Sequence, residues 1–106
     1  MPAISDLENA LRGTNLPFAL FGWDHAPAGN YGVFSPDRRR DLLADGDHVE
    51  HAISGTVDWF TRSPRNGDME AIEAALQSVG AWSLESIQYE EETRYTHFEW
   101  SFGIYG

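Results

Sequence analysis

The sequence contains no cysteine and no lysine, and all seven of its basic residues are arginines. Without cysteine there is no disulfide framework, no thiolate metal site and no cysteine nucleophile. Stretches without a charged residue, such as residues 13–23, fall well short of the ~20 apolar residues that a membrane-spanning helix needs. The amino terminus also lacks the cationic start and apolar run of a secretion signal. We therefore expect a soluble cytosolic protein with no membrane partner.

Negative charge dominates the composition. The 106 residues include 17 acidic side chains, and the formal net charge is −10. Such a surface repels phosphate, so specific nucleic-acid binding is not expected. The length and the absence of repeats or linkers predict a single domain over residues 1–106. Composition alone predicts one small acidic domain and no particular function.

Hydrophobic periodicity predicts two helices. The first covers residues 3–12, where Ser5 and Glu8 match the reciprocal capping pattern of a helix start. The second follows residues 66–68, which supply a turn and an N-cap, and ends at Gly80. Both helices are amphipathic, so each is expected to pack one face against a sheet.

Alternating and apolar runs predict strands at residues 18–23, 31–34, 48–61, 84–89 and 95–105. The last two are expected to form a hairpin. The predicted fold is α+β: an antiparallel sheet of about four to five strands with two α-helices packed on one face. We expect the other face to carry Trp, Tyr and Phe side chains among acidic residues, which is more apolar surface than a small monomer normally exposes.

No pattern of reactive residues indicates an enzyme. His48 and His51 would point to opposite faces of a strand and could not share a metal ion, and residues 45–47 lack the donors of a calcium loop. Asp58 and Glu99 are the only plausible catalytic pair of carboxylates, although two outward-facing acids explain them better. Nucleophile-elbow and phosphate-loop patterns are absent. We predict no catalytic, cofactor-binding or metal-binding residues.

One basic cluster interrupts the acidic sequence, at residues 38–40. Arginine side chains suit carboxylate recognition, so this loop of one copy could dock on the acidic surface of the next. A solvated loop neutralised by its flanking aspartates is an equal alternative. The outward face of the last strand offers further contacts. The candidate inter-subunit residues are Arg38, Arg39, Arg40, Tyr95, Glu99 and Tyr105.

Over roughly residues 16–105, several features follow one another in a recognisable order. They are a proline-containing approach to a Tyr-x-Val strand at 27–33, an Ala-Asp-Gly loop at 44–46, a strand end at 57–61, a helix at 71–76 and a closing strand at 94–100. This order resembles the small tail-terminator, or tail-to-head joining, proteins of bacteriophages and prophages with long non-contractile tails.

The resemblance implies a structural protein that forms a homo-oligomeric ring, typically a hexamer, at the head-proximal end of the virion tail. Assembly would take place in the host cytoplasm. Such a ring ends polymerisation of the tail-tube protein and joins the tail to the head connector or completion protein. DNA would only pass through the lumen, without specific binding, and no cofactor is implied.

Two other classes of function remain open from the residues alone. A small acidic protein could mimic DNA and inhibit a basic host protein in a salt-sensitive way. A small α+β ligand-binding module or enzyme could build a site from Asp58, Glu99 and histidines. Neighbouring genes for a major tail protein and a tape-measure protein would favour the tail function, whereas an isolated gene beside a repressor would favour the inhibitor.

Replacement of Arg38, Arg39 and Arg40 together by serine tests the arginine cluster. If these side chains join neighbouring copies, the variant should assemble poorly while its melting temperature stays close to that of the unchanged protein. Light scattering over a concentration series measures assembly. Unimpaired assembly would favour the solvated loop.

Overall fold

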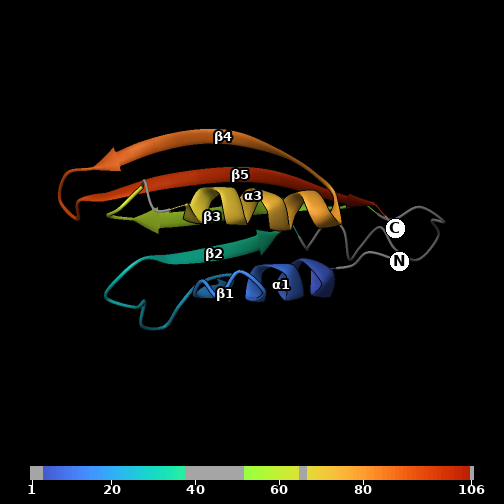
Figure 1. The fold of residues 1–106 in the computed structure, drawn as a ribbon, viewed down its shortest axis with the longest axis horizontal. Coiled ribbons are helices and arrows are strands. Elements are labelled where there is room, and N and C mark those ends of the chain that lie inside the picture. The colour runs from blue at the N-terminus through green and yellow to red at the C-terminus, as the bar shows by residue number, and fades with distance from the viewer. Residues whose placement is uncertain (1–3, 38–51, 65–66, 106) are drawn as a thin grey trace.

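The structure, a computed structural model, describes residues 4–37, 52–64 and 67–105. Its elements in chain order are α1 (Ile4–Arg12), β1 (Phe18–Leu20), β2 (Tyr31–Pro36), β3 (Ala52–Thr61), α3 (Asp68–Val79), β4 (Ala81–Glu90) and β5 (Tyr95–Tyr105). The five strands form one sheet in the order β1-β2-β3-β5-β4, and both helices lie on one face of it (Figure 1). The predicted α+β class is confirmed.

The sheet is mixed, whereas the sequence predicted a fully antiparallel one. β1 runs parallel to β2, and the other neighbouring pairs are antiparallel. The segment between β1 and β2 is long enough for the chain to return to the end of the sheet where β1 begins. β2 starts at that same end and therefore runs parallel to β1. The hairpin of β4 and β5 is confirmed, with β4 extending beyond the predicted bounds at both ends.

The core lies between the helices and the two central strands. Trp59 of β3 and Trp100 of β5 are both completely buried. Trp100 Nε1 donates a hydrogen bond of 2.9 Å to Glu73 Oε2, which ties α3 to β5. The alternation along β3 places Val57 and Trp59 together on the buried face. The helical residues in this core are Leu7, Leu11, Ile72, Ala75 and Leu76.

Two glycines allow close approaches that a larger residue would prevent. The ring of Phe18 lies over Gly32, where a Cβ would overlap it, and its centroid is 5.4 Å from that of Trp59. At Gly55, a Cβ would overlap the Ser35 carbonyl oxygen of the neighbouring strand. These contacts hold β1 and β2 tightly against the rest of the sheet.

The first strand is shorter than predicted. β1 ends at Leu20 because Phe21, with φ 66°, and Gly22, with φ 146°, turn the chain away from an extended path. Trp23 then folds back over β2, where its Nε1 donates a 2.8 Å hydrogen bond to the Gly32 carbonyl. The apolar run at 18–23 is therefore part strand and part turn.

The sequence predicted the helix starts only in part, since the N-cap of α3 lies within residues 66–68 but α1 lacks the expected capping pattern. Ser5 lies inside α1 and not before it, and Glu8 pairs with Arg12 at 2.6 Å, one turn along the same helix. The N-cap of α3 is Gly67, with φ 87° and no side-chain cap, while Gly80 ends the helix as predicted. Neither described helix has the length and apolarity to cross a membrane.

Substitution of Trp59 by alanine tests the core. We expect a loss of about 3–5 kcal/mol in the free energy of unfolding, because the indole is completely buried. The control is Gln88→Ala, at an exposed position on β4, with an expected loss of about 0.5 kcal/mol or less. Urea unfolding followed by circular dichroism measures both. Equal losses would show that the core is misassigned.

Candidate functional site

The sheet face away from the helices, called here the open face, carries a row of stacked rings. Tyr31, Phe60 and His97 lie on three neighbouring strands, with centroid distances of 4.8 Å between the first two and 4.2 Å between the last two. The expectation that tryptophans share this face was wrong for Trp59 and Trp100, which alternation places on the helix side. The open face is aromatic through Tyr, Phe and His.

A histidine and a carboxylate meet at the centre of the open face. His97 Nε2 lies 2.8 Å from Asp58 Oδ1, and the two side chains are 21% and 19% exposed. The Phe60 ring against His97 fixes the orientation of the imidazole. This pair joins β3 to β5 and leaves both groups partly accessible to solvent.

The two carboxylates considered as a catalytic pair stand directly opposite each other. Asp58 of β3 pairs with Glu99 of β5 in the sheet register. Like charges in directly opposite positions repel each other. Each carboxylate has a different partner: Asp58 lies against His97, and Glu99 Oε1 accepts a hydrogen bond of 3.4 Å from Ser86 Oγ. Both acids lie on an open sheet surface, in agreement with two outward-facing side chains. Among the described residues, no three potential ligands are grouped to hold a metal ion.

Tyr95, a candidate for contacts between copies, is largely covered by its own chain. It is only 8% exposed, and its hydroxyl lies 2.8 Å from the Gly29 carbonyl oxygen, to which it donates. The Arg62 guanidinium sits 4.1 Å above the ring and also donates to the carbonyls of Ala28 and Thr93. These contacts fasten the loop before β2 to the end of the sheet. Little of the Tyr95 side chain is left for another copy.

The other predicted residues are placed as follows. Glu99 lies half-buried on the open face, as predicted. The backbone of Tyr105 pairs with Ala52 at the end of β5, but its side chain is outside the described part of the chain. The remaining features lie outside it altogether: Arg38, Arg39, Arg40, residues 44–47, His48 and His51.

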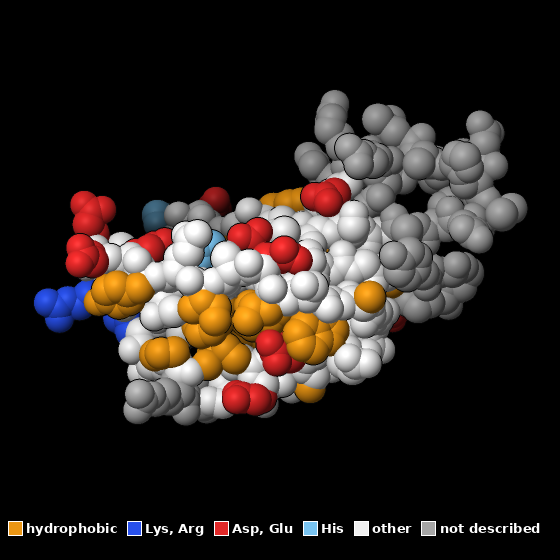
Figure 2. All heavy atoms as spheres, turned by 90° about the horizontal axis from the view of Figure 1, so that it is seen from above, with side chains coloured by type: hydrophobic (Ala, Val, Ile, Leu, Met, Phe, Trp, Pro, Cys, Tyr) orange, Lys and Arg blue, Asp and Glu red, His pale blue; other side chains and the backbone are white. Residues whose placement is uncertain are grey.

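The most exposed apolar surface is on the edge strand β4, where the sequence did not predict it. Leu84, Ile87 and Tyr89, called here the β4 apolar row, are 41%, 56% and 61% exposed. Viewed onto this edge, hydrophobic side chains gather along the middle of the molecule with carboxylates beside them (Figure 2).

A bulge explains why strict alternation missed this row. Leu84 and Ile87 are three residues apart and would point to opposite faces of a regular strand. The register shifts between Leu84 and Ser86, so that Leu84 lies opposite Trp100 and Ile87 lies opposite Phe98, on the helix side. The extra residue, Glu85, accepts a 2.8 Å hydrogen bond from Ser101.

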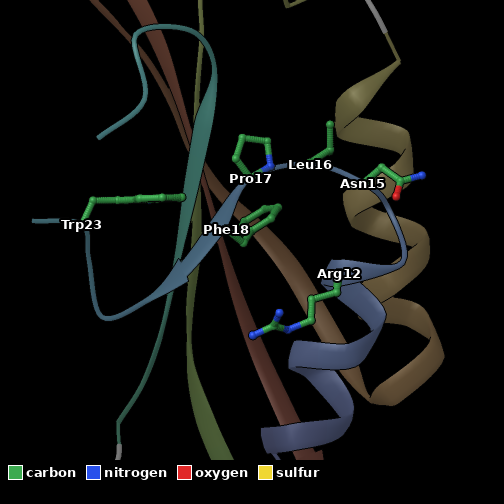
Figure 3. Close-up of a pocket in the computed structure, with 6 residues that line it drawn as sticks. All are labelled: Arg12, Asn15, Leu16, Pro17, Phe18 and Trp23. Carbon is green, nitrogen blue, oxygen red and sulfur yellow. The ribbon is translucent and has the colours of Figure 1, made fainter. Parts of the chain in front are cut away.

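A shallow pocket lies at the other edge of the sheet. Its volume is about 410 Å³, and Figure 3 shows the Arg12 side chain extending from the end of α1 toward the sheet. The lining residues are Arg12, Asn15, Leu16, Pro17, Phe18 and Trp23. The carboxylates of the open face are not among them, so the pocket and the His97–Asp58 pair are separate features.

Searches against protein-family models, curated proteins and solved structures find no significant match to this chain. Its function is therefore inferred from its own surfaces and from the order of its sequence features.

The open face predicts a specific pH dependence. Burial raises the pKa of Tyr31. The neighbouring Tyr95 and Glu90 raise this pKa further, and Arg62 partly opposes the rise. The folded state thus holds this proton more tightly than the unfolded state does. The resulting stability is complete below the ordinary tyrosine pKa of about 10 and is lost as the pH rises through the higher pKa of the folded protein.

Substitution of Tyr31 by phenylalanine should therefore reduce the loss of stability in this alkaline range. Urea unfolding at a series of pH values measures it, and the ultraviolet absorbance of tyrosinate follows the ionisation. Tyr89→Phe, at an exposed tyrosine, controls for the general loss of a hydroxyl. Identical alkaline losses in the Tyr31 variant and the unchanged protein would contradict the assignment.

Proposed function

We propose that this chain is a structural subunit of a phage or prophage virion, which closes into a homo-oligomeric ring at the head-proximal end of the tail. The ring, a hexamer in the family that the sequence resembles, ends tail-tube polymerisation and joins the tail to the head. Its partners are further copies of itself, the tail-tube protein and the head connector or completion protein. The observation that carries the proposal is the β4 apolar row.

An exposed edge strand with apolar side chains is unfavourable for a protein that stays single. Edge strands are usually short, charged or covered, because they otherwise pair with other chains. β4 is 10 residues long and forms one end of the sheet. Its most exposed large side chains, Ile87 and Tyr89, stay about half exposed or more. A building block that buries this strand in an assembly accounts for both features.

The charge of the chain also suits a ring around DNA. With a net charge of −10, the subunit repels the phosphate backbone, so a duplex would slide through a lumen lined by such subunits without being held. The His97–Asp58 pair joins neighbouring strands and requires no substrate to explain it. Both points support a structural role.

A DNA-mimic inhibitor is the main competing function, because it too needs many carboxylates. Such a protein would bind its basic partner chiefly by charge, and the binding would weaken steeply with salt. Binding that depends chiefly on charge would not require the β4 apolar row. Self-association that persists in high salt therefore favours the ring subunit.

Deletion of the gene from the phage or prophage that encodes it tests the proposal directly. We expect tails of uncontrolled length, or tails detached from heads, in electron micrographs of the lysate, because nothing would end tube growth. Complementation with the intact gene should restore normal virions. The purified protein mixed with tail tubes should appear as a ring at one tube end. Normal virions from the deletion strain would refute the assignment.

A further inference from the structure

The exposed apolar side chains fall into two groups at opposite ends of one sheet. Among the residues that the structure describes, the large hydrophobic side chains that remain exposed are Leu20, Phe21, Leu84, Ile87 and Tyr89. The first two lie at β1 and the other three form the β4 apolar row. β1 and β4 are the two outermost strands in the order β1-β2-β3-β5-β4. Each edge of the molecule thus carries its own apolar patch.

Both patches belong to the same side of the sheet. Leu20 lies beside Phe34 in the register, and Phe34 is buried in the core beneath the helices. Leu84 and Ile87 lie beside Trp100 and Phe98, which belong to the same core. In Figure 1, α3 lies over β3 and β5 and α1 lies at the level of β1, whereas β4 has no helix in front of it; Leu20, at the end of β1, is nevertheless 45% exposed. A neighbouring copy placed edge to edge could cover these exposed apolar side chains.

The two edges differ in shape and charge. Beside β1, the pocket is lined by apolar side chains with Arg12 at its rim, and the Arg12 side chain is 72% exposed (Figure 3). Its pairing with Glu8 is a surface ion pair, which contributes little and is readily exchanged. Glu85 and Glu90 lie on the other side of β4, the open face, where Glu85 accepts from Ser101 and Glu90 stands beside Tyr95 in the register. On the helix side, the apolar row of one edge would therefore meet a largely apolar pocket at the other.

Strand directions make these edges compatible. β1 runs with β2 and β5, while β3 and β4 run in the opposite direction. Two copies placed side by side in the same orientation would bring β4 of one antiparallel to β1 of the next. This is the direction in which strands pair most readily across a sheet edge. Pairing of β4 with β4 would instead place Glu85 and Glu90 of both copies close together.

We propose that the β4 edge of one copy docks against the β1 edge of the next, with the β4 apolar row seated at the pocket between α1 and β1. The contact is heterologous, because two different patches meet, so each copy retains a free patch of each kind until the chain of copies closes. This inference rests on the proposed ring and identifies the surfaces that build it.

Two single variants and their mixture test the contact. Leu20→Asp blocks the β1 edge, and Ile87→Asp blocks the β4 edge. Each variant alone should fail to assemble, because every contact would include one blocked patch. In an equal mixture, the intact β4 edge of the first meets the intact β1 edge of the second. The mixture should therefore form dimers, with twice the monomer mass in analytical ultracentrifugation, and no larger rings.

The matched control is Gln88→Asp, which adds the same charge to the same strand on the open face. It should assemble as the unchanged protein does. Both blocked positions are exposed, so circular dichroism and melting should show that each variant folds. The experiment is run on the protein alone and with tail tubes, over a concentration series.

The outcomes separate this inference from the proposed function. A mixture that remains monomeric, or normal assembly of either blocked variant, overturns the edge-to-edge contact, even where gene deletion gives the expected tail defect. Dimers in the mixture support the contact, even where deletion leaves virions normal and the ring function fails. An unchanged protein that stays monomeric at every concentration, with and without tubes, overturns the contact.

Discussion

The antiparallel register of β3 and β5 determines which side chains lie on each face of the sheet. It places Trp59 and Trp100 beneath the helices and Asp58 and His97 on the open face. A slip of one residue in either strand would exchange the two faces, bringing carboxylates under the helices and indoles into water. The cost of burying those charges explains why one register is so strongly favoured. The core, the open face and both sheet edges take their positions from this pairing.

The sequence predicts the parts of the fold that depend on regular spacing. The alternation around Trp59 identifies the buried face, and the apolar stripe ending at Gly80 identifies the second helix. The early end of β1 and the row on β4 are not predictable in this way. The early end of β1 depends on a left-handed φ at Phe21, and the row on β4 depends on a bulge at Glu85. Tertiary contacts, and not regular spacing, determine these two features. The candidate contact surface was therefore largely missed.

The size of the helical layer explains where apolar surface remains. The sheet has five strands, and the two helices share a core with the side chains of its central part. A helix is about 10 Å across with its side chains, while neighbouring strands are about 4.8 Å apart, so two helices cover roughly four strands. On β4, which has no helix in front of it, Ile87 consequently stays exposed, and Leu20 stays exposed at the end of β1. The proposed edge contact between copies would cover both side chains.

An acidic chain that binds its own copies must hold them by something other than charge. Near physiological salt the Debye length is about 8 Å, so repulsion between distant carboxylates is weak and apolar contact dominates at close range. The acids of β4 still affect the orientation of the proposed contact. Glu85 and Glu90, on the open-face side of β4, disfavour a symmetric β4 pair, in which they would lie close to the same residues of the other copy. In the proposed contact, apolar burial therefore supplies the affinity, and this repulsion favours a head-to-tail arrangement, which is the arrangement that a ring requires.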